Sequence, residues 1–452
     1  MSATIEKEEA KDILQAFIEA IHEADIDRID ELLEDMHPAE ISHLLESLPV
    51  NDREVIWQHI PSELGGEILL HLNDEARASF ISKMEPAELV AATETLETDD
   101  LADILPDIPR DISHELLLSM EQEDREQLRS VLSYPEDSAG GLMDLNTVVV
   151  RADTTLDVVL RYLRRLGEIP EHTNNLFVVD RDGIYQGRLA LTDLLINEPA
   201  CYVHEIMQYD DEGIPADMSA RDVAILFERR DLITAPVVNE EGLLLGRITI
   251  DDVVDVIRDE ADHSLMSMAG LNEEEDMFAP VITSTRRRSV WLGINLMTAF
   301  LASWVIGQFD QTIEKLVALA ILMPIVASMG GIAGSQTLTL VIRGMALGQI
   351  GSSNARRLVV KEALVGVWNG LIWAVVIAGV AGLWFDSLKL AIIIAAAILI
   401  NLVIAALSGA TIPLILKRLG ADPALSGTVV LTTVTDVIGF LAFLGLASLF
   451  LV

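Results

Sequence analysis

The chain has 452 residues, of which 51% are hydrophobic, and it carries a formal net charge of −40. A mean hydropathy of +0.38 is too high for an ordinary soluble protein, and the length allows about two to four domains. The one cysteine, Cys201, excludes an internal disulfide and a cysteine zinc site.

The charge is divided unevenly along the chain. Residues 1–285 hold 65 acidic and 20 basic residues, a net of −45, whereas residues 286–452 hold 6 and 11, a net of +5. We therefore predict an acidic soluble part joined to an apolar, slightly basic part near residue 286. The acidic part should attract cations and repel nucleic acid and anionic lipid surfaces. Solubility or a high-salt habitat is the alternative explanation of its charge. Because the N-terminus is acidic and polar and has no signal peptide, we expect the soluble part in the cytoplasm.

Residues 1–133 are predicted to form an all-α domain of short amphipathic helices. The phrase Met-His-Pro-Ala-Glu-Ile at residues 36–41 returns 48 residues later as Met-Glu-Pro-Ala-Glu-Leu, which is typical of stacked helix pairs. Asp99 and Asp103 share one helical face at positions i and i+4, a spacing at which like charges are destabilising without a counter-ion. Two interpretations stay open, namely a cation at this face or an N-cap followed by a solvated face.

Residues 134–258 alternate strands and helices and contain the same order twice, with a period near 60 residues. The second copy reads Thr-Ala-Pro-Val-Val at residues 234–238 and Gly-Arg-Ile-Thr-Ile-Asp-Asp-Val at residues 246–253. This α/β pattern resembles a tandem pair of CBS domains. CBS pairs are sensing modules, often for adenine nucleotides or cations, so the resemblance implies a sensor and not an enzyme.

Residues 259–288 are predicted to connect the sensor to the membrane part. The acidic pattern of the preceding helix continues through residue 262, and the charge run at residues 272–276 is typical of a solvated linker. Three arginines at residues 286–288 then abut the first apolar run. We expect a connecting helix here, where a sensor would be coupled to a pore.

Residues 289–452 contain five apolar runs long enough to cross a bilayer, for which ~20 residues suffice. Their basic residues set the orientation. With the N-terminus inside, all but Lys315 and Lys389 lie on the cytoplasmic side, so the C-terminus is expected outside. The predicted spans are residues 289–308, 314–342, 359–385, 388–414 and 425–451.

The last span contains one carboxylate, Asp436, about 16 Å along the helix from Leu425 at ~1.5 Å per residue. Left unpaired at this depth, an acid costs on the order of 2.5–3.5 kcal/mol. The span has no Lys or Arg, and oxygen ligands suit a hard divalent cation. The alternative is a protonated Asp436 bonded to a neighbouring helix. The hydroxyls expected around it are those of Thr428, Thr432, Thr433 and Thr435.

The second span carries Gly-Gly-Ile-Ala-Gly-Ser-Gln at residues 330–336, downstream of Pro324. The glycines allow helices to pack closely. With Pro324 they also allow a bend that frees carbonyls, which is tolerated only where the backbone is buried or lines a wet cavity. Both interpretations stay open.

The order of these parts resembles the MgtE family of magnesium channels over essentially the full chain. The most specific matches are Pro324 with residues 330–336, and Asp-Pro-Ala at residues 422–424 through Thr-Asp-Val at residues 435–437. The resemblance implies a multi-domain membrane protein with an all-α N domain, an α/β tandem CBS pair, a connecting helix and a five-helix transmembrane domain. The implied domains are residues 1–133, 134–258, 259–288 and 289–452. The implied assembly is a homodimer in the lipid bilayer, with the pore between protomers.

The resemblance also implies functional residues. Asp436 is expected to hold a hydrated Mg²⁺ in the pore, because Mg²⁺ sheds its waters reluctantly. Cytosolic Mg²⁺ is expected to close the channel by bridging the acidic domains and the connecting helix. The implied ligands of regulatory Mg²⁺ are Glu67, Asp99, Asp103, Asp231, Asp252, Asp255 and Glu260.

Departures from the family pattern narrow these expectations. Ser219, Arg221 and His263 stand where acids occur in some members, which implies fewer or weaker regulatory ions. Some members bind ATP between their CBS modules. Of the positions involved, Asp193 matches as a nucleotide contact, but three others differ, so ATP binding of that kind is not expected here. The positions that differ are Asn175, Thr192 and Leu232.

We therefore predict a Mg²⁺-selective channel for uptake across the plasma (inner) membrane, closed by cytosolic Mg²⁺, and not an enzyme. One alternative is a transporter of Co²⁺, Ni²⁺ or Zn²⁺, against which the lack of His, Cys or Met beside Asp436 argues. The other is a membrane CBS sensor without transport, which leaves Asp436 unexplained. No nucleophile–base pair or His-based metal site occurs in the spans.

Overall fold

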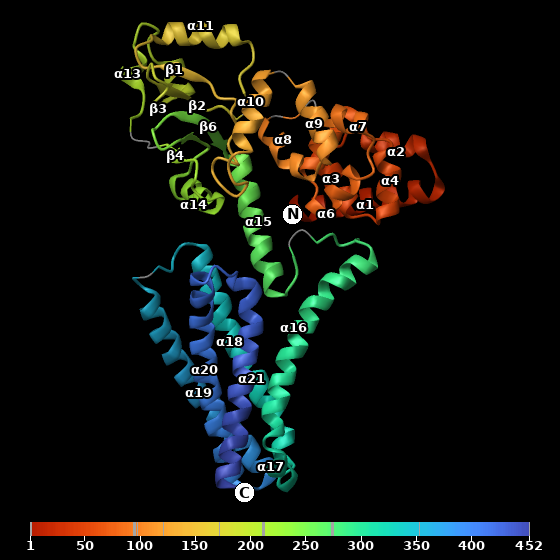
Figure 1. The fold of residues 1–452 in the computed structure, drawn as a ribbon, viewed down its shortest axis with the longest axis vertical. Coiled ribbons are helices and arrows are strands. Elements are labelled where there is room, and N and C mark those ends of the chain that lie inside the picture. Colours follow the sequence, from red (N-terminus) through yellow and green to blue (C-terminus); the bar gives the residue numbers. More distant parts are fainter. Residues whose placement is uncertain are drawn as a thin grey trace. The chain divides into compact units, whose positions relative to one another are not determined.

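The computed structural model divides into two compact units, and each is described by itself (Figure 1). Unit 1 comprises Met1–Glu260 and Glu274–Pro280, and unit 2 comprises Ala261–Glu273 and Val281–Val452. The structure describes residues 2–93, 96, 98–120, 122–170, 172–209, 213–272, 275–351 and 353–451. Within these ranges, the side chains of residues 2–11, 98, 99, 111, 115, 119, 123 and 124 are not described.

The first part of unit 1 is a stack of short helices, as the repeated phrase predicted. Local capping explains where several of them begin. Pro38 occupies the first turn of its helix, and His37 forms a capping box with Glu40. Asn73 caps another helix by accepting a hydrogen bond from the Ala76 amide. These elements are α1 (Ser2–Glu23), α2 (Ile26–Leu33), α3 (Pro38–Glu46), α4 (Val50–Trp57), η1 (Ser62–Leu64), α5 (Gly65–Leu70), α6 (Asp74–Ile81), α7 (Pro86–Thr93), α8 (Thr98–Ile104), η2 (Leu105–Asp107), α9 (Arg110–Ser119) and α10 (Gln122–Val131).

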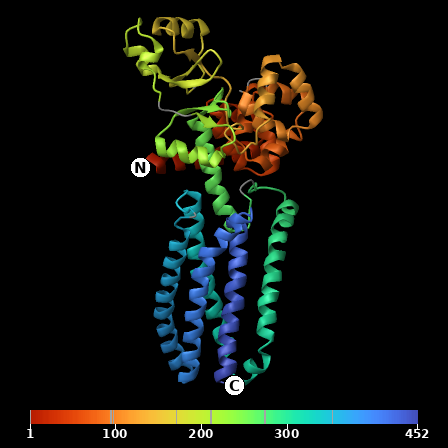
Figure 2. The same cartoon turned by 60° about the vertical axis from the view of Figure 1, so that its left-hand side comes forward.

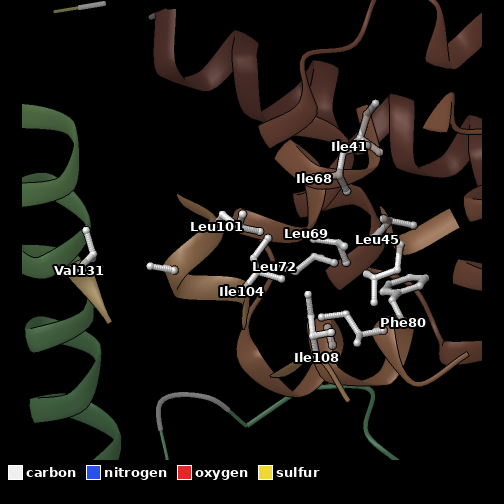
Figure 3. Close-up of a cluster of buried hydrophobic side chains, with 14 of the residues drawn as sticks. Ile41, Leu45, Ile68, Leu69, Leu72, Phe80, Leu101, Ile104, Ile108 and Val131 are labelled. Atoms are coloured by element: carbon white, nitrogen blue, oxygen red, sulfur yellow. The ribbon is translucent and has the colours of Figure 1, made fainter. Parts of the chain in front are cut away.

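Each short helix contributes a few apolar side chains to one shared core. Figure 3 shows Leu69, Leu72 and Phe80 pointing into this cluster beside Leu101 and Ile104 of α8. No helix of eight or ten residues is stable alone in water, so burial of these stripes holds the stack together. The core therefore fixes where α8, with its acidic residues, is placed within the N domain.

The CBS part of unit 1 contains two three-stranded sheets of identical topology, β1-β2-β3 and β4-β5-β6. In each sheet the first pair is parallel and the second antiparallel. Both carry a register shift at the same place, Val178/Val179 and Val237/Val238, so the sequence repeat is a structural repeat. The elements are β1 (Val149–Arg151), α11 (Leu156–Leu166), β2 (Asn175–Val179), β3 (Tyr185–Ala190), α12 (Leu191–Ile196), α13 (Val203–Ile206), β4 (Ile214–Pro215), α14 (Ala220–Arg230), β5 (Thr234–Val238), β6 (Leu244–Thr249) and α15 (Ile250–Met268).

A buried ion pair joins the N domain to the segment that precedes the first span. Arg53 on α4 is 2% exposed and Asp276 is 5% exposed. The two Arg53 Nη atoms each donate to one Asp276 carboxylate oxygen at 2.7 Å. Arg53 Nε donates to the Leu48 carbonyl at 2.7 Å, and Glu75 accepts from the Asp276 amide at 3.0 Å. Both charges are therefore well paired, as burial demands.

Unit 2 is a bundle of long apolar helices. Among the described residues, five helices are long and apolar enough to cross a membrane. α20 packs against α18, α19 and α21, and α18, α20 and α21 lie side by side in both views (Figures 1 and 2). The elements are α16 (Val281–Gly307), α17 (Asp310–Lys315), α18 (Ala318–Ala346), α19 (Ala355–Phe385), α20 (Leu388–Arg418) and α21 (Pro423–Phe450).

Three element boundaries differ from those expected from the sequence. The helix that continues the last CBS helix, α15, extends through Met268 and so past the acidic pattern that ends at residue 262. The arginines 286–288 lie inside α16 and do not abut its start. The second span, expected at residues 314–342, is α18 at Ala318–Ala346, and the short α17 precedes it.

We predict that Arg53→Met lowers stability by about 3–5 kcal/mol, because Asp276 is then buried without its counter-charge. The double variant Arg53→Met/Asp276→Leu should lose much less, since no charge remains buried. The control Arg161→Met removes the exposed pair with Asp157 at 2.8 Å and should cost about 1 kcal/mol or less. Thermal unfolding of the full chain in detergent measures all three. Equal losses for the single and double variants would contradict this account.

Candidate functional site

The first candidate site lies on α21. Pro423 starts this helix, and Asp422 caps it by accepting from the amides of Ala424 and Leu425, each at 2.9 Å. Asp436 lies near the middle of the helix and is half-buried. In the part of the chain that the structure describes, its carboxylate has no hydrogen bond or ion pair. The alternative of a bond to a neighbouring helix therefore has no counterpart there.

The threonines around Asp436 are bonded to main-chain carbonyls. Thr432 and Thr433 donate to the carbonyls of Thr428 and Val429 at 3.0 and 2.7 Å, and Thr435 donates to the Thr432 carbonyl at 3.1 Å. The hydroxyl protons of these three threonines are thus engaged within α21. Each hydroxyl oxygen still has lone pairs that can accept hydrogen bonds from water.

α18 presents two different faces. Gly330 and Gly334 are buried, and a Cβ atom at Gly334 would lie 2.8 Å from Leu431 of α21. Gly331 has nothing within 4 Å of such an atom and lies on an open groove of about 670 Å³. Gly330 and Gly334 therefore allow close helix packing, whereas Gly331 lies on the groove. The groove is lined by Ser328, Gly331, Ile332, Ser335, Gln336 and Thr339.

Asn401 of α20 is a functional candidate that the sequence reasoning missed. Its side chain is 0% exposed and donates from Nδ2 to the Val326 carbonyl of α18 at 2.8 Å. A Cβ atom at Gly330 would lie 2.3 Å from this nitrogen, and one at Gly439 would lie 2.8 Å from it. Asn401 is thus wedged between α18 and α21, against Gly439, which lies three residues from Asp436 in sequence. A lone Asn in an apolar span was the available signal.

Glu362 of α19 was also missed. It is 3% exposed, and its Oε1 lies 2.6 Å from Lys361 Nζ. Thr337 of α18 donates to its other oxygen at 3.4 Å. This carboxylate is therefore paired within unit 2, unlike Asp436. Its place only seven residues after the start of α19 made it look like part of the polar flank.

The end of α15 that belongs to unit 2 packs on the pore helices. Met268 contacts an apolar cluster that includes Leu338 of α18 and Leu431 of α21. Thr428 of α21 donates to the Met268 carbonyl at 3.4 Å, and His263 Nε2 lies 3.6 Å from Asp422. The connecting helix thus touches the beginning of the helix that carries Asp436.

The second candidate site is an acidic interface in unit 1, between α8 of the N domain and α15 of the second CBS module. Loss of hydration, together with the nearby carboxylates Glu136 and Asp255, raises the pKa of Asp103 to about 7, although the charge of Arg77 opposes this shift. Loss of hydration also raises the pKa of Asp252 to about 7, together with the charges of Asp251 and Asp100. Acidic groups from two domains therefore repel one another here.

The pKa of Asp255 is raised as well. Loss of hydration raises its pKa, while His71 and Arg258 oppose the shift. Asp103 and Asp255 retain solvent-accessible surface, so a cation can approach this interface from water. The structure thus brings together Asp103, Asp252 and Asp255 of the predicted set and adds Asp100 and Glu136, which the sequence reasoning missed.

No interaction with Asp103 or Asp252 is found for the other predicted site residues whose side chains the structure describes. Glu67 and Asp231 are exposed, and Glu260 lies 3.6 Å from Arg221 Nε. Asp193 is half-buried in the first turn of α12. Asp99 belongs to α8, but its side chain is outside the described residues. Among the described side chains, no three His, Cys, Asp or Glu residues converge as a ready-made metal site.

Family models match most of the chain. The one described as a divalent cation transporter, MgtE, matches residues 323–446. The MgtE intracellular N domain matches residues 36–137, and the CBS domain matches residues 139–198 and 203–259. The chain is 32% identical over 438 residues to magnesium transporter MgtE of Thermus thermophilus, which covers 96% of this chain and 97% of that protein. The chain belongs to the MgtE family.

One further relative and two solved structures are also similar to this chain. Magnesium transporter MgtE of Bacillus subtilis is 31% identical over 321 residues, 71% of each chain. The cytosolic domain of the Mg²⁺ channel MgtE in complex with ATP is 34% identical, with a TM-score of 0.49 over 54% of this chain and 99% of that one. The soluble part of a magnesium transporter is 22% identical, with a TM-score of 0.47 over 56% and 99%.

We predict that stability without divalent cations falls as the pH rises from 3.8 to about 7. A raised carboxyl pKa means that the folded state binds more protons than the unfolded state in this window, so the penalty is complete above it. Adding Mg²⁺ should therefore raise the thermal midpoint more at about pH 8 than at about pH 5. Asp103→Asn/Asp252→Asn should flatten the pH dependence. An unchanged pH profile in that variant would contradict the assignment.

We also predict that Gly439→Ala destabilises the membrane unit, because the new Cβ atom would lie 2.8 Å from Asn401 Nδ2. Gly445→Ala on the same helix is the matched control, since its Cβ atom meets nothing within 4 Å. The control should be neutral or stabilising by up to about 1 kcal/mol, as alanine favours helix. Thermal unfolding in detergent compares them. A control as destabilised as Gly439→Ala would rule out the wedge.

Proposed function

We propose that this protein is a Mg²⁺-selective channel for magnesium uptake, closed by cytosolic Mg²⁺. Membership of the MgtE family supports magnesium transport by a multi-pass membrane protein. The observation that carries the proposal is Asp436, a half-buried carboxylate in a spanning helix with no bonding partner in the described part of the chain. Such a group is too costly for structure alone and marks an ion path.

The chemistry near Asp436 suits a hydrated cation. Mg²⁺ keeps several waters and is bound through one or two carboxylates. The threonine hydroxyls are engaged as donors to carbonyls, which leaves their lone pairs free to accept hydrogen bonds from the waters of the ion. This arrangement favours recognition through the hydration shell and gives no soft ligand for other metals.

We propose a homodimer with the pore between protomers. The polar stripe of Ser328, Ser335 and Gln336 lies on an open groove of α18, and such groups do not face lipid without cost. A second protomer would cover this groove and enclose a wet path. In this arrangement the N-terminal domains lie in the cytoplasm, the C-terminus outside, and the protein in the plasma membrane.

We propose that regulation resides in the acidic interface. Without a cation, Asp103 and Asp252 repel their acidic neighbours; with Mg²⁺ between them, α8 and α15 are held together. α15 continues to Met268, where it touches the start of α21. Cytosolic Mg²⁺ thus favours the state in which α15 contacts the pore helices. The other proposed regulatory residues are Glu67, Asp99, Asp231, Asp255 and Glu260.

We predict that Asp436→Asn abolishes Mg²⁺ uptake by proteoliposomes, because the isosteric amide carries no charge for the ion. Asp386→Asn is a control that removes a carboxylate from the loop end of α19, where Asp386 is the C-cap. It should leave uptake near the wild-type rate. Full uptake by Asp436→Asn, with normal insertion, would exclude Asp436 from the pore.

We predict that Asp252→Asn/Asp255→Asn/Glu260→Gln stays open at millimolar Mg²⁺, because the bridging charges are removed. Electrical recordings on excised patches, with Mg²⁺ varied on the cytosolic side, measure this. Glu240→Gln/Glu241→Gln, which changes the acidic turn between β5 and β6, is the control and should close normally. Normal closure of the triple variant would refute the regulatory assignment.

The main alternative is a transporter of another divalent cation, consistent with the broader description of the family model. Competition separates the two. If excess Co²⁺ or Ni²⁺ leaves Mg²⁺ uptake unchanged, the pore is selective for Mg²⁺; if either ion is itself carried at a comparable rate, the alternative holds. Because the family is one of transporters, we propose no catalytic role. The one nucleotide contact that we retain as a prediction is Asp193.

A further inference from the structure

One face of α19 carries a stripe that changes from basic to apolar along the helix. Arg356 and Arg357 lie in the first turn, Lys361 in the second, and Leu364 and Trp368 further along. All five side chains are exposed, Trp368 by 67%. The face borders an open groove of about 780 Å³. Its lining is Ser353, Arg356, Arg357, Val360, Lys361, Leu364, Val365, Trp368 and Asn369.

The opposite face of α19 explains why this one is outward. Glu362, Gly366 and Gly370 are buried at a spacing of four residues. A Cβ atom at Gly366 would lie 2.7 Å from Ala406 of α20, and one at Gly370 would lie 2.7 Å from Leu399. The small residues bring α19 close to α20, and the basic stripe is left on the surface of the bundle.

The two arginines are the available charges on this stripe. Lys361 is 2.6 Å from the buried Glu362 and is partly neutralised. Arg356 and Arg357 have no ion pair with any residue that the structure describes. A guanidinium binds a phosphate through two parallel hydrogen bonds and holds a charge at every physiological pH. Two adjacent guanidinium groups therefore form a strong site for a phosphate monoanion.

We propose that this face binds an anionic phospholipid. The phosphate lies at Arg356 and Arg357, and an acyl chain lies along Val360, Leu364 and Trp368. The distance from Arg356 to Trp368 is about 18 Å at ~1.5 Å per residue, which is enough for a headgroup and much of one chain. Basic groups at the cytoplasmic end of a span are where anionic headgroups are found. The site rests on the proposed orientation, in which this end of α19 is cytoplasmic.

A second copy of the chain fits this face less well. A membrane dimer has its two-fold axis along the bilayer normal, so equivalent residues lie at equal depth. An interface built on this stripe would set the Arg356–Arg357 pair of one protomer at the level of the same pair of its partner. Those four positive charges would repel one another in a medium of low dielectric constant. A lipid phosphate instead supplies the opposite charge.

The test measures lipid binding by the full-length protein in a non-ionic detergent. Dioleoylphosphatidylglycerol is titrated against dioleoylphosphatidylcholine, and bound lipid is counted by native mass spectrometry. Arg356→Gln/Arg357→Gln should lose roughly tenfold or more in affinity for the glycerol lipid, as expected when charge-assisted hydrogen bonds are removed. Lys417→Gln/Arg418→Gln is the matched control, because these exposed residues end another span. It should bind like the wild type.

Four results would overturn the proposal. Two are equal binding of the two lipids and equal loss in both double variants. The third is conversion of Arg356→Gln/Arg357→Gln to a different oligomeric state with lipid binding unchanged, which would mean that a second copy covers this face. The fourth is displacement of the lipid by millimolar inorganic phosphate, which would show an anion site that needs no acyl chain. Since no transport is measured, the result is independent of whether Asp436 conducts Mg²⁺.

Discussion

The proposed ion sites are built on carboxylates that lack enough neighbouring positive charge within the chain. Asp436 has no bonding partner among the described residues of the bundle, and the pKa of Asp103 and Asp252 is raised to about 7 by lost hydration and by neighbouring acids. In both places a divalent cation would remove the cost. The proposed Mg²⁺ would therefore serve two sites in different surroundings, one in a spanning helix and one between soluble domains.

Several buried charges elsewhere in the molecule are paired with an opposite charge. Arg53 and Asp276 are paired bidentately, Asp144 accepts from Arg247 at 2.8 Å, and Glu362 lies 2.6 Å from Lys361. The desolvation cost of burying these ions is offset by close ion pairs and hydrogen bonds to other residues of the chain. Asp436 and Asp103 differ from these groups, because neither has a close ion pair within the described part of the chain.

Much of the fold could be predicted from the sequence because its patterns are long. The CBS repeat and the apolar runs extend over tens of residues, so local errors average out. The ends of elements could not be predicted in this way: α16 includes three arginines, and α15 continues six residues past its last acidic residue, Asp262. A charge is tolerated inside a helix that extends into water, so charge alone does not mark a boundary. Asp436 was visible because it is isolated in an apolar run. Asn401 and Asp100 were not, since their roles arise from Gly330, Gly439 and Asp252, which are distant in sequence.

The proposed regulatory site and the proposed pore are joined by the course of the chain. Two segments lead from the acidic interface toward the spans. α15 carries Asp252 at its start and touches Thr428 through Met268 at its end. The segment that follows is fixed to the N domain at Asp276, five residues before α16 begins. If Mg²⁺ holds α8 against α15, as we propose, it acts on the two stretches of chain that lead into α16 and α21. The Arg53–Asp276 pair is buried and bidentate, so the stretch before α16 is held firmly on the N domain.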